Sequence, residues 1–410
     1  MPARRSCRVR PAHTCDLTLY RQMRICIVYD CLYPYTVGGA ERWYRELAER
    51  LVAEGHDVTY LTLRQWERGA RLDLDPRISV HAVGPRMALY TGDRRRILPP
   101  LRFGSGVLAH LLRHGHRYEV VYTASFPYFS LLAAGVAARL YRYRLVVDWH
   151  EVWSEAYWRE YLGPLGGRIG HAVQRLCARI PQRAFCFSRL YAQRLRAEGM
   201  RGELTILRGQ YQPSGRTPSA PASTTDEQGA GAPVLFAGRM IPEKQVLLGL
   251  EAVAIARARL PELQACFFGE GPQRRALLAR IERLGLADCV SAPGFVSAEV
   301  LAAAMRGALC LLLPSRREGY GKVVVEAAAF GTPSIVVAGQ DNAATELIED
   351  GVNGFLVTAA DPHQLSGAII RVKELGAGLR GSTRRWFSEN ESELALESSL
   401  ERVLASFRSS

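Results

Sequence analysis

The sequence predicts an α/β protein built from two doubly wound parallel sheets that face each other across a cleft. Short apolar strand patterns alternate with longer helical patterns, and one polar stretch over 212–232 interrupts the alternation. Near-continuous apolar strands separated by helices are typical of parallel sheets covered on both faces. A chain of 410 residues, 48% of them hydrophobic, is long enough for two such domains.

The first 22 residues have no apolar periodicity, and Met23 stands directly before the first apolar run. We interpret 1–22 as a disordered tail or as the product of an upstream start codon. A secretory signal would need an apolar core, which this segment lacks.

The N-terminal domain is expected over 23–211, with a helix over Gly39–Glu54 between its first two strands. The predicted strands are Ile25–Tyr29, Val58–Leu63, Ile78–Val83, Val120–Thr123, Leu145–Asp148, Ala184–Phe187 and Leu204–Leu207. A basic amphipathic helix is predicted around Val107–Leu112, because arginines stand on both sides of this apolar pattern. The alternative is an ordinary solvated helix with arginine stems packed over its flank.

Residues 212–232 are rich in Pro, Ser, Thr, Gly and Ala, which predicts a flexible linker. A C-terminal domain is expected over 233–385. Its predicted strands are Val234–Ala237, Gln264–Phe268, Leu309–Leu313, Ser334–Val337 and Gly354–Val357, and its predicted helices are Glu243–Ala258, Gln273–Leu284, Tyr320–Phe330 and Ala343–Glu349.

The net charge of +13 lies entirely in the first half of the chain. Residues 1–220 hold 34 arginines against 18 acidic residues, whereas 221–410 hold 19 basic and 22 acidic residues. This asymmetry suggests an anionic surface or substrate facing the N-terminal domain. Nucleic acid is not the expected partner, because no zinc-finger, RNP-type or basic-zipper pattern accompanies the charge.

The nine cysteines include no C-x-x-C pair, and no run of eighteen apolar residues occurs. The first observation argues against a disulfide framework or zinc site, and the second against a membrane-spanning helix. We therefore expect a cytoplasmic protein whose cysteines are small buried hydrophobes.

Two glutamates follow the predicted strand Leu309–Leu313. Glu318 lies in a glycine-containing turn and Glu326 lies in the helix that begins there, about two helical turns later. Ligands of parallel sheets bind where strands end in such turns. The alternative is an i, i+4 pair of Lys322 with Glu326 on a solvated helix face, although valines and alanines surround Glu326.

Two cations follow the predicted strand Val234–Ala237. Gly238 permits a tight turn, and Arg239 and Lys244 come just before a helix. Cations converging at a strand-to-helix turn suit a diphosphate, because Arg can fork and Lys acts as a point charge. The alternative is a pair of solvated basic side chains.

Together, Arg239, Lys244 and Glu318-x7-Glu326 resemble the pattern of glycosyltransferase family 4, which has the GT-B fold of two Rossmann-like domains. The segment VYDCLYPYTVGGAERWYRELAERLVAEGHDVTYLT resembles the same family through its Gly-Gly loop and EGH-D-V turn. The resemblance implies a retaining, metal-independent transferase of the hexosyltransferase type. Its donor would be a UDP- or GDP-sugar, with no other cofactor, and a C-terminal helix in 386–410 would cross back to the first domain.

The resemblance implies roles for the C-terminal domain. Arg239 and Lys244 would hold the diphosphate, Glu326 would accept the ribose hydroxyls, and Glu318 would contact the donor sugar. The remaining implied contacts are backbone to sugar and phosphate at Gly319, Tyr320 and Gly321, and contacts to the base at Phe295 and Val296.

The resemblance also implies roles for the N-terminal domain. Gly38 and Gly39 would bring backbone N–H groups near the diphosphate, and His150 would lie close to the sugar. For His150 the alternative is a satisfied, partly buried histidine. One departure is Arg208-Gly209-Gln210, where many family members have Asn-Gly.

Several alternatives stay open at this point. Asp73-Leu74-Asp75 spells the D-x-D pattern of metal-dependent transferases, which we interpret as chance, and no metal site is predicted. Retention by double displacement would need a carboxylate nucleophile, such as Asp148 or Glu151. The rival functions are a nucleotide-sugar epimerase of the same fold and an inactive partner subunit. The expected acceptor is lipid-linked or a saccharide in cell-envelope or exopolysaccharide synthesis, at an anionic membrane surface.

Overall fold

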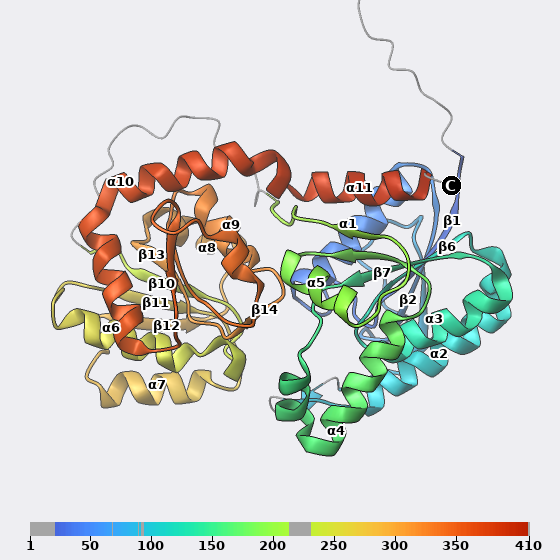
Figure 1. The fold of residues 1–410 in the computed structure, drawn as a ribbon, viewed down its shortest axis with the longest axis horizontal. Coiled ribbons are helices and arrows are strands. Elements are labelled where there is room, and N and C mark those ends of the chain that lie inside the picture. Colours follow the sequence, from blue (N-terminus) through green and yellow to red (C-terminus); the bar gives the residue numbers. More distant parts are fainter. Residues whose placement is uncertain (1–20, 68, 89, 92–93, 213–230, 409–410) are drawn as a thin grey trace, which may run out of the picture.

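Two parallel sheets, each between layers of helices, form the protein in a computed structural model that describes residues 21–67, 69–88, 90–91, 94–212 and 231–408. Figure 1 shows the two halves side by side. The predicted fold class is therefore confirmed. Most of the predicted tail (1–22) and of the predicted linker (212–232) lies outside the described residues.

The first sheet has seven parallel strands in the order β3-β2-β1-β6-β7-β8-β9. They are β1 (Arg24–Val28), β2 (Asp57–Leu63), β3 (Ser79–Gly84), β6 (Val120–Ala124), β7 (Arg144–Trp149), β8 (Arg183–Cys186) and β9 (Leu204–Ile206). Alternate side chains point to opposite faces, so Val120 and Val121 pack in two different cores. This double burial explains the continuous apolar runs of the sequence.

Helices cover both faces of this sheet. One face is covered by α1 (Gly39–Ala53) and the other by α2 (Leu98–His114), α3 (Tyr128–Tyr141), α4 (Glu155–Ala178) and α5 (Arg189–Ala197). The domain also contains a short antiparallel pair, β4 (Tyr90–Thr91) with β5 (Arg94–Arg95), and a 3-10 turn, η1 (Gly115–Arg117).

The second sheet has six parallel strands in the order β12-β11-β10-β13-β15-β17. They are β10 (Val234–Ala237), β11 (Ala265–Phe268), β12 (Val290–Gly294), β13 (Cys310–Leu313), β15 (Ser334–Val337) and β17 (Gly354–Val357). The helices around it are α6 (Val246–Arg257), α7 (Arg274–Arg283), α8 (Ala298–Gly307), α9 (Lys322–Ala329) and α10 (Pro362–Leu394). Two short strands, β14 (Arg317–Glu318) and β16 (Asp341–Asn342), pair separately.

Two predicted helices of the C-terminal domain differ from the structure. The predicted helix Glu243–Ala258 is a 3-10 turn, η2 (Pro242–Lys244), followed by α6, because Gln245 between them has a left-handed backbone (φ 48°). The predicted helix Ala343–Glu349 is a five-residue 3-10 turn, η3 (Ala343–Leu347).

The chain crosses between the domains twice, and the crossings touch. The N–H groups of Gln210 and Tyr211 donate to the Leu394 carbonyl (3.0 and 2.9 Å), and the Leu396 N–H donates to the Tyr211 carbonyl (2.7 Å). After the second crossing, α11 (Leu396–Arg408) packs in the same core as α1. Figure 1 shows α11 lying along the first domain.

The second crossing begins later than the predicted boundary at 386, because Trp386 and Phe387 still pack in the core of the second domain. Within the described residues, none of the helices has both the length and the apolarity that crossing a bilayer requires.

Candidate active site

The carboxyl ends of the two sheets face each other. Strand β13 leads to β14, and Figure 1 shows β14 on the side of the second domain nearest to α5. The Tyr191 hydroxyl of α5 donates to the carbonyl of Glu318 at 3.0 Å. Because ligands of open parallel sheets bind at the carboxyl ends of strands, the junction of the two domains is the candidate active site.

Glu318 and Lys244 form an ion pair at this junction. The Lys244 ammonium donates to Oε1 of Glu318 at 2.5 Å, and the Glu318 side chain is only 9% exposed. The pair joins η2, after β10, to β14, after β13. The structure therefore brings together two predicted site residues from separate segments, and it supplies a carboxylate partner for Lys244 that was not predicted from the sequence.

Arg239 differs from Lys244 in its surroundings. It directly follows Gly238 at the end of β10, and its side chain is exposed. Among the residues that the structure describes, none forms a hydrogen bond or ion pair with the Arg239 guanidinium. Of the two predicted diphosphate ligands, Lys244 is thus paired with a carboxylate, whereas the Arg239 side chain is free to bind an anion.

Glycines bring the segments that follow β10 and β11 into close contact. A Cβ at Gly269, which has φ 131°, would lie 1.9 Å from the Gly238 carbonyl oxygen, and one at Gly271 would lie 2.5 Å from that of Met240. Neither glycine was predicted as a site residue, although the GEGP segment that contains them is part of the pattern that resembles glycosyltransferase family 4.

The two residues predicted to contact the base follow β12 and differ in exposure. Phe295 is 67% exposed, whereas Val296 packs against the core. Of this pair, only Phe295 therefore presents a free face to a ligand.

Glu326 lies on α9 with its side chain 23% exposed, and its carboxylate is 3.7 Å from the Lys322 ammonium. The solvated pair considered as the alternative thus forms, but on a mostly buried face. Burial raises the pKa of Glu326, while Lys322 and Arg42 of α1 oppose the shift. The influence of Arg42 indicates that the start of α1 lies near α9 across the junction.

The turn between Glu318 and α9 contacts both domains. A Cβ at Gly319 would lie 3.0 Å from the His150 carbonyl oxygen, and one at Gly321, which has φ 96°, would lie 2.5 Å from Ala344. The Tyr320 hydroxyl donates to the Arg208 carbonyl, so this side chain serves the domain junction. Only the backbone of this turn remains for a ligand.

His150 of the N-terminal domain meets this turn through its backbone carbonyl. Its ring stacks on Phe187 at 4.6 Å between centroids with an interplanar angle of 4°. Burial lowers the pKa of His150 to about 4, so the imidazole is neutral at neutral pH. Its Nε2 is buried and has no partner among the described residues. A neutral imidazole with an unused nitrogen can form a hydrogen bond with a substrate hydroxyl.

Neither open candidate for a carboxylate nucleophile is free. Asp148 is fully buried, and its oxygens accept hydrogen bonds from the Tyr122 hydroxyl (2.6 Å) and Trp43 Nε1 (2.7 Å). The Glu151 carboxylate pairs with Arg317 and accepts a hydrogen bond from Trp153 Nε1 at 2.8 Å. Both side chains are already committed to structural contacts.

The Gly-Gly loop lies at the start of α1. The backbone of Gly38 is extended (φ −171°), and a Cβ there would lie 2.3 Å from Oε2 of Glu41. A Cβ at Gly39 would meet nothing within 4 Å. The contact at Gly38 is with the flexible end of the Glu41 side chain, and the space that a Cβ of Gly39 would occupy is open, at a helix N-terminus whose first N–H groups have no intrahelical partner.

The Asp-x-Asp pattern lies outside this junction, in the loop between β2 and β3. Asp75 pairs with Arg77 at 2.7 Å, and Asp73 lies 3.5 Å from Arg45. In the part of the chain that the structure describes, no three His, Cys, Asp or Glu side chains gather as a metal site would require.

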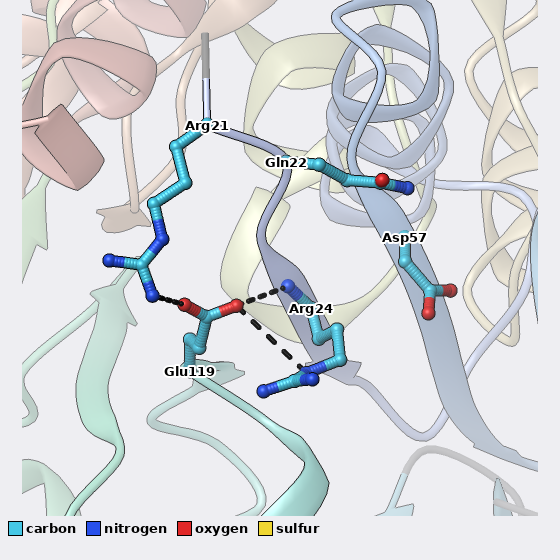
Figure 2. A pocket seen from close by; sticks show the side chains of 5 residues that line it. All are labelled: Arg21, Gln22, Arg24, Asp57 and Glu119. Atoms are coloured by element: carbon cyan, nitrogen blue, oxygen red, sulfur yellow. Dashed lines mark hydrogen bonds and ion pairs between the residues drawn. The ribbon is translucent and has the colours of Figure 1, made fainter.

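Two pockets have very different positions. A pocket of about 300 Å³ lies at the amino ends of β1 and β2, whereas the junction lies at the carboxyl ends of the strands. Figure 2 shows that the carboxylate of Glu119, which lines this pocket, lies between Arg21 and Arg24. A second pocket of about 130 Å³ is lined from both domains, by Tyr157 and Glu160 and by Arg316, Arg317 and Asp341 among others. The second pocket belongs to the junction, and the first does not.

Two family models match the chain, one for each domain. The model described as "Glycosyl transferase 4-like domain" matches residues 38–209, and the one described as "Glycosyl transferases group 1" matches 226–393. The D-inositol 3-phosphate glycosyltransferase of Streptomyces avermitilis is 30% identical over an alignment of 357 residues, which covers 79% of this chain and 73% of that protein.

Other relatives match over shorter segments. The alpha-D-kanosaminyltransferase of Streptomyces kanamyceticus is 34% identical over 139 residues, which are 34% of this chain and 36% of that protein. The chain thus spans about a third of the length of this relative.

Solved structures share the whole fold. Sucrose-phosphate synthase from Thermosynechococcus elongatus has a TM-score of 0.72 at 18% identity, covering 94% of this chain and 98% of that one. Anabaena Alr3699/HepE, solved in complex with UDP, has a TM-score of 0.69 at 18% identity, covering 95% of this chain and 100% of that one. At such identity these likenesses describe the fold alone.

Proposed function

Because the chain belongs to the GT-B glycosyltransferases, with a 4-like first domain and a group 1 second domain, we propose that it is a retaining glycosyltransferase. It transfers a sugar from a UDP- or GDP-sugar to a lipid-linked or saccharide acceptor. The main support is one juxtaposition: the turn after the Glu318–Lys244 pair meets the backbone of His150 across the junction.

In this proposal the donor binds at the second domain. Arg239 and the remaining N–H groups of Lys244 bind the diphosphate and stabilise its charge as it leaves. Glu326 accepts the ribose hydroxyls, and Phe295 stacks on the base. The Alr3699/HepE protein of the same fold was also solved with UDP-glucose, which supports a nucleotide sugar as the donor class.

The transfer itself takes place on one face of the sugar. The bond from the anomeric carbon to the diphosphate breaks, and the acceptor oxygen forms a new bond to that carbon on the same side. The acceptor proton passes to the departing diphosphate oxygen. The commitment of Asp148 and Glu151 to structural contacts supports this front-face route over double displacement. Neutral His150 orients a sugar hydroxyl, and Glu318 steadies the developing positive charge.

A donor panel tests the proposal. UDP-, GDP- and ADP-sugars are incubated with the protein, with and without lipid extract and with and without a strong chelator, and nucleotide release is measured. We expect acceptor-dependent release that survives the chelator, because Arg239 and Lys244 take the place of a metal. A changed sugar released without acceptor would identify an epimerase, and no turnover of any donor would favour an inactive subunit. Loss of activity in chelator, restored by manganese, would contradict metal independence.

Membrane association is a further part of the proposal. At the start of α2, Ile97 is 62% and Leu98 51% exposed, between the exposed Arg96 and Arg102. Exposed apolar side chains flanked by cations suit an anionic bilayer surface, at about 1 kcal/mol per basic residue. Such a surface faces the cytoplasm, where we propose the protein acts.

Vesicle sedimentation tests this part. The protein should sediment with anionic but not neutral vesicles, and added salt should weaken binding. The double variant Ile97→Ser/Leu98→Ser should bind less, whereas Leu278→Ser, an exposed leucine on α7, should not change binding. Equal recovery in the supernatant with both vesicle types would favour a soluble acceptor.

A further inference from the structure

Arg317 directly precedes Glu318 in β14, and no role was predicted for it from the sequence. Its guanidinium pairs with the Glu151 carboxylate of the N-terminal domain and lies 3.8 Å from that of Glu243. The side chain is only 14% exposed. A buried arginine is stable only where its charge is paired, and here one of the two carboxylates comes from the other domain.

Two aromatic rings of the N-terminal domain complete the surroundings of this arginine. The guanidinium carbon of Arg317 lies 4.5 Å from the centroid of Tyr157 and 4.9 Å from that of Trp153. Such contacts of arginine with ring faces are attractive, more so where water is excluded. The rings also hold the carboxylates, because Trp153 Nε1 donates to Glu151 and the Tyr157 hydroxyl donates to Glu243, at 2.8 and 2.9 Å.

The position of Arg317 in the chain connects this cluster to the candidate active site. Glu243 directly precedes Lys244, and Arg317 directly precedes Glu318. The cluster therefore fixes the two backbone segments that present the Lys244–Glu318 pair. The same segments are joined directly, because the Arg316 N–H donates to the Glu243 carbonyl at 3.0 Å.

Separation of the domains would remove most of these contacts. Arg317 would lose Glu151, Trp153 and Tyr157 and keep only Glu243. Arg317 lies in the two-stranded ribbon formed by β14 and β16. Another contact of this ribbon would break as well, because Arg194 of α5 pairs with Asp341 of β16 at 2.5 Å. The ribbon that contains Glu318 is thus held in place from the N-terminal domain.

We propose that Arg317 is a positioning residue, which couples the docking of the N-terminal domain to the alignment of Glu318 and Lys244. This inference rests on the proposed glycosyl transfer. Arg317 does not itself touch the donor. Its planar fork binds a carboxylate while its face stacks on two rings, which lysine cannot do.

A kinetic comparison tests the proposal, with Arg316 as the matched control. Arg316 is the neighbouring arginine, and its pair with Glu160 also joins the two domains. This pair lies at the surface, where both side chains are more than 40% exposed and an ion pair contributes little. We expect Arg317→Gln to lower kcat by about 10–100-fold, as a small misplacement of reacting groups does, with little change in the donor KM. Arg317→Lys should stay closer to Arg317→Gln than to wild type, and Arg316→Gln should behave as wild type.

A structural readout is independent of activity. In solution scattering of the substrate-free protein, we expect a larger radius of gyration for Arg317→Gln than for wild type and Arg316→Gln. If wild type turns over no donor, the proposed function fails, but the scattering comparison still decides the role of Arg317.

Tyr157→Phe keeps the ring and removes only the hydroxyl that binds Glu243, so it tests the cluster if Arg317→Gln melts early. It should lower kcat by a smaller factor and leave KM unchanged. Wild-type kcat and an unchanged radius of gyration in these variants would overturn the proposal, as would equal losses in Arg316→Gln.

Discussion

Burial shifts the pKa values of two titratable side chains at the end of β7, Asp148 and His150, in opposite directions. Burial raises the pKa of Asp148, and although hydrogen bonds from Tyr122 and Trp43 lower it, the resulting pKa is about 7. Burial lowers the pKa of His150 to about 4. The ordinary values are 3.8 and 6.5. In both cases the neutral form is favoured because a buried charge loses its hydration.

These shifts predict opposing pH dependences of stability. Between pH 3.8 and about 7 the folded state binds a proton at Asp148 that the unfolded state lacks, so the free energy of unfolding falls as pH rises. Between about 4 and 6.5 the unfolded state binds a proton at His150 that the folded state lacks, so the free energy of unfolding rises with pH. Over the shared range the two contributions largely cancel.

Asp148→Asn should remove one of these contributions. Relative to wild type, the free energy of unfolding of the variant should rise by about 3 kcal/mol from pH 4 to pH 7, since one pKa unit corresponds to about 1.4 kcal/mol. Denaturant titrations of both proteins across this range measure the difference. Parallel curves would show that burial does not shift the pKa of Asp148 in this way.

The two glutamates of the candidate site should differ in their kinetics. If Glu326 accepts ribose hydroxyls equally in ground and transition states, Glu326→Gln should raise the donor KM by about 10–150-fold and leave kcat nearly unchanged. If Glu318 orients the donor sugar, as proposed, and holds Lys244, Glu318→Gln should lower kcat more than it changes KM.

Thermal melts must first show that both glutamine variants are folded, because the Lys244–Glu318 pair is mostly buried. Loss of turnover in Glu326→Gln together with weaker binding in Glu318→Gln would reverse the two roles. No change in either constant would place the donor elsewhere.

At the level of single residues, the sequence indicated types and order but not contacts. Lys244 and Glu318 could be named because each follows an apolar strand pattern, yet nothing in the sequence shows that they pair with each other. Arg317 could not be recognised at all, since its partners Glu151, Trp153 and Tyr157 are more than 150 positions away in the chain. Such contacts depend on how the two domains pack.

Among the elements, the start of α1 offers the sharpest test. Because a Cβ at Gly39 meets nothing in the chain, Gly39→Ala should melt like wild type. If the N–H groups there approach the diphosphate, the added methyl should raise the donor KM by about tenfold, the value of one lost hydrogen bond to a charged group.

Gly367→Ala in α10 is the matched control, because a Cβ there also meets nothing within 4 Å. Both constants should stay at wild-type values in that control. An unchanged KM in Gly39→Ala as well would mean that α1 does not contact the donor.

The long buried strands were predictable as elements, whereas the short ones depend on tertiary contacts. Strand β12 was missed because its sequence, VSAPG, contains Pro and Gly and has little apolar character. The two-residue strands β14 and β16 exist only because each pairs with the other beside the junction. Helix α4 was missed too, since Gly163, Pro164 and three further glycines weaken its helical pattern.

For the whole molecule, α11 makes the stability of the first domain depend on the end of the chain. Phe407 is buried and meets the ring of Tyr122 edge-on at 6.2 Å. Phe407→Ala should therefore lower the free energy of unfolding of the first domain by about 3–5 kcal/mol.

Tryptophan fluorescence during denaturation measures this change, because Trp386 is the only tryptophan outside 23–211. Leu375→Ala, at an exposed position of α10, should change stability by less than about 0.5 kcal/mol. Equal stability of Phe407→Ala and wild type would show that α11 is not needed by the first domain.

The two touching crossings at Tyr211 and Leu396 have a mechanical consequence. Two domains joined by two separate chain segments can slide, twist and tilt relative to each other. Here the two segments are hydrogen-bonded into one narrow strip. Such a strip bends easily across its width and resists shear along it. A swing of one domain about this strip is therefore the relative motion that the joint resists least, and reversing it would return His150 to the same place opposite the turn after Glu318.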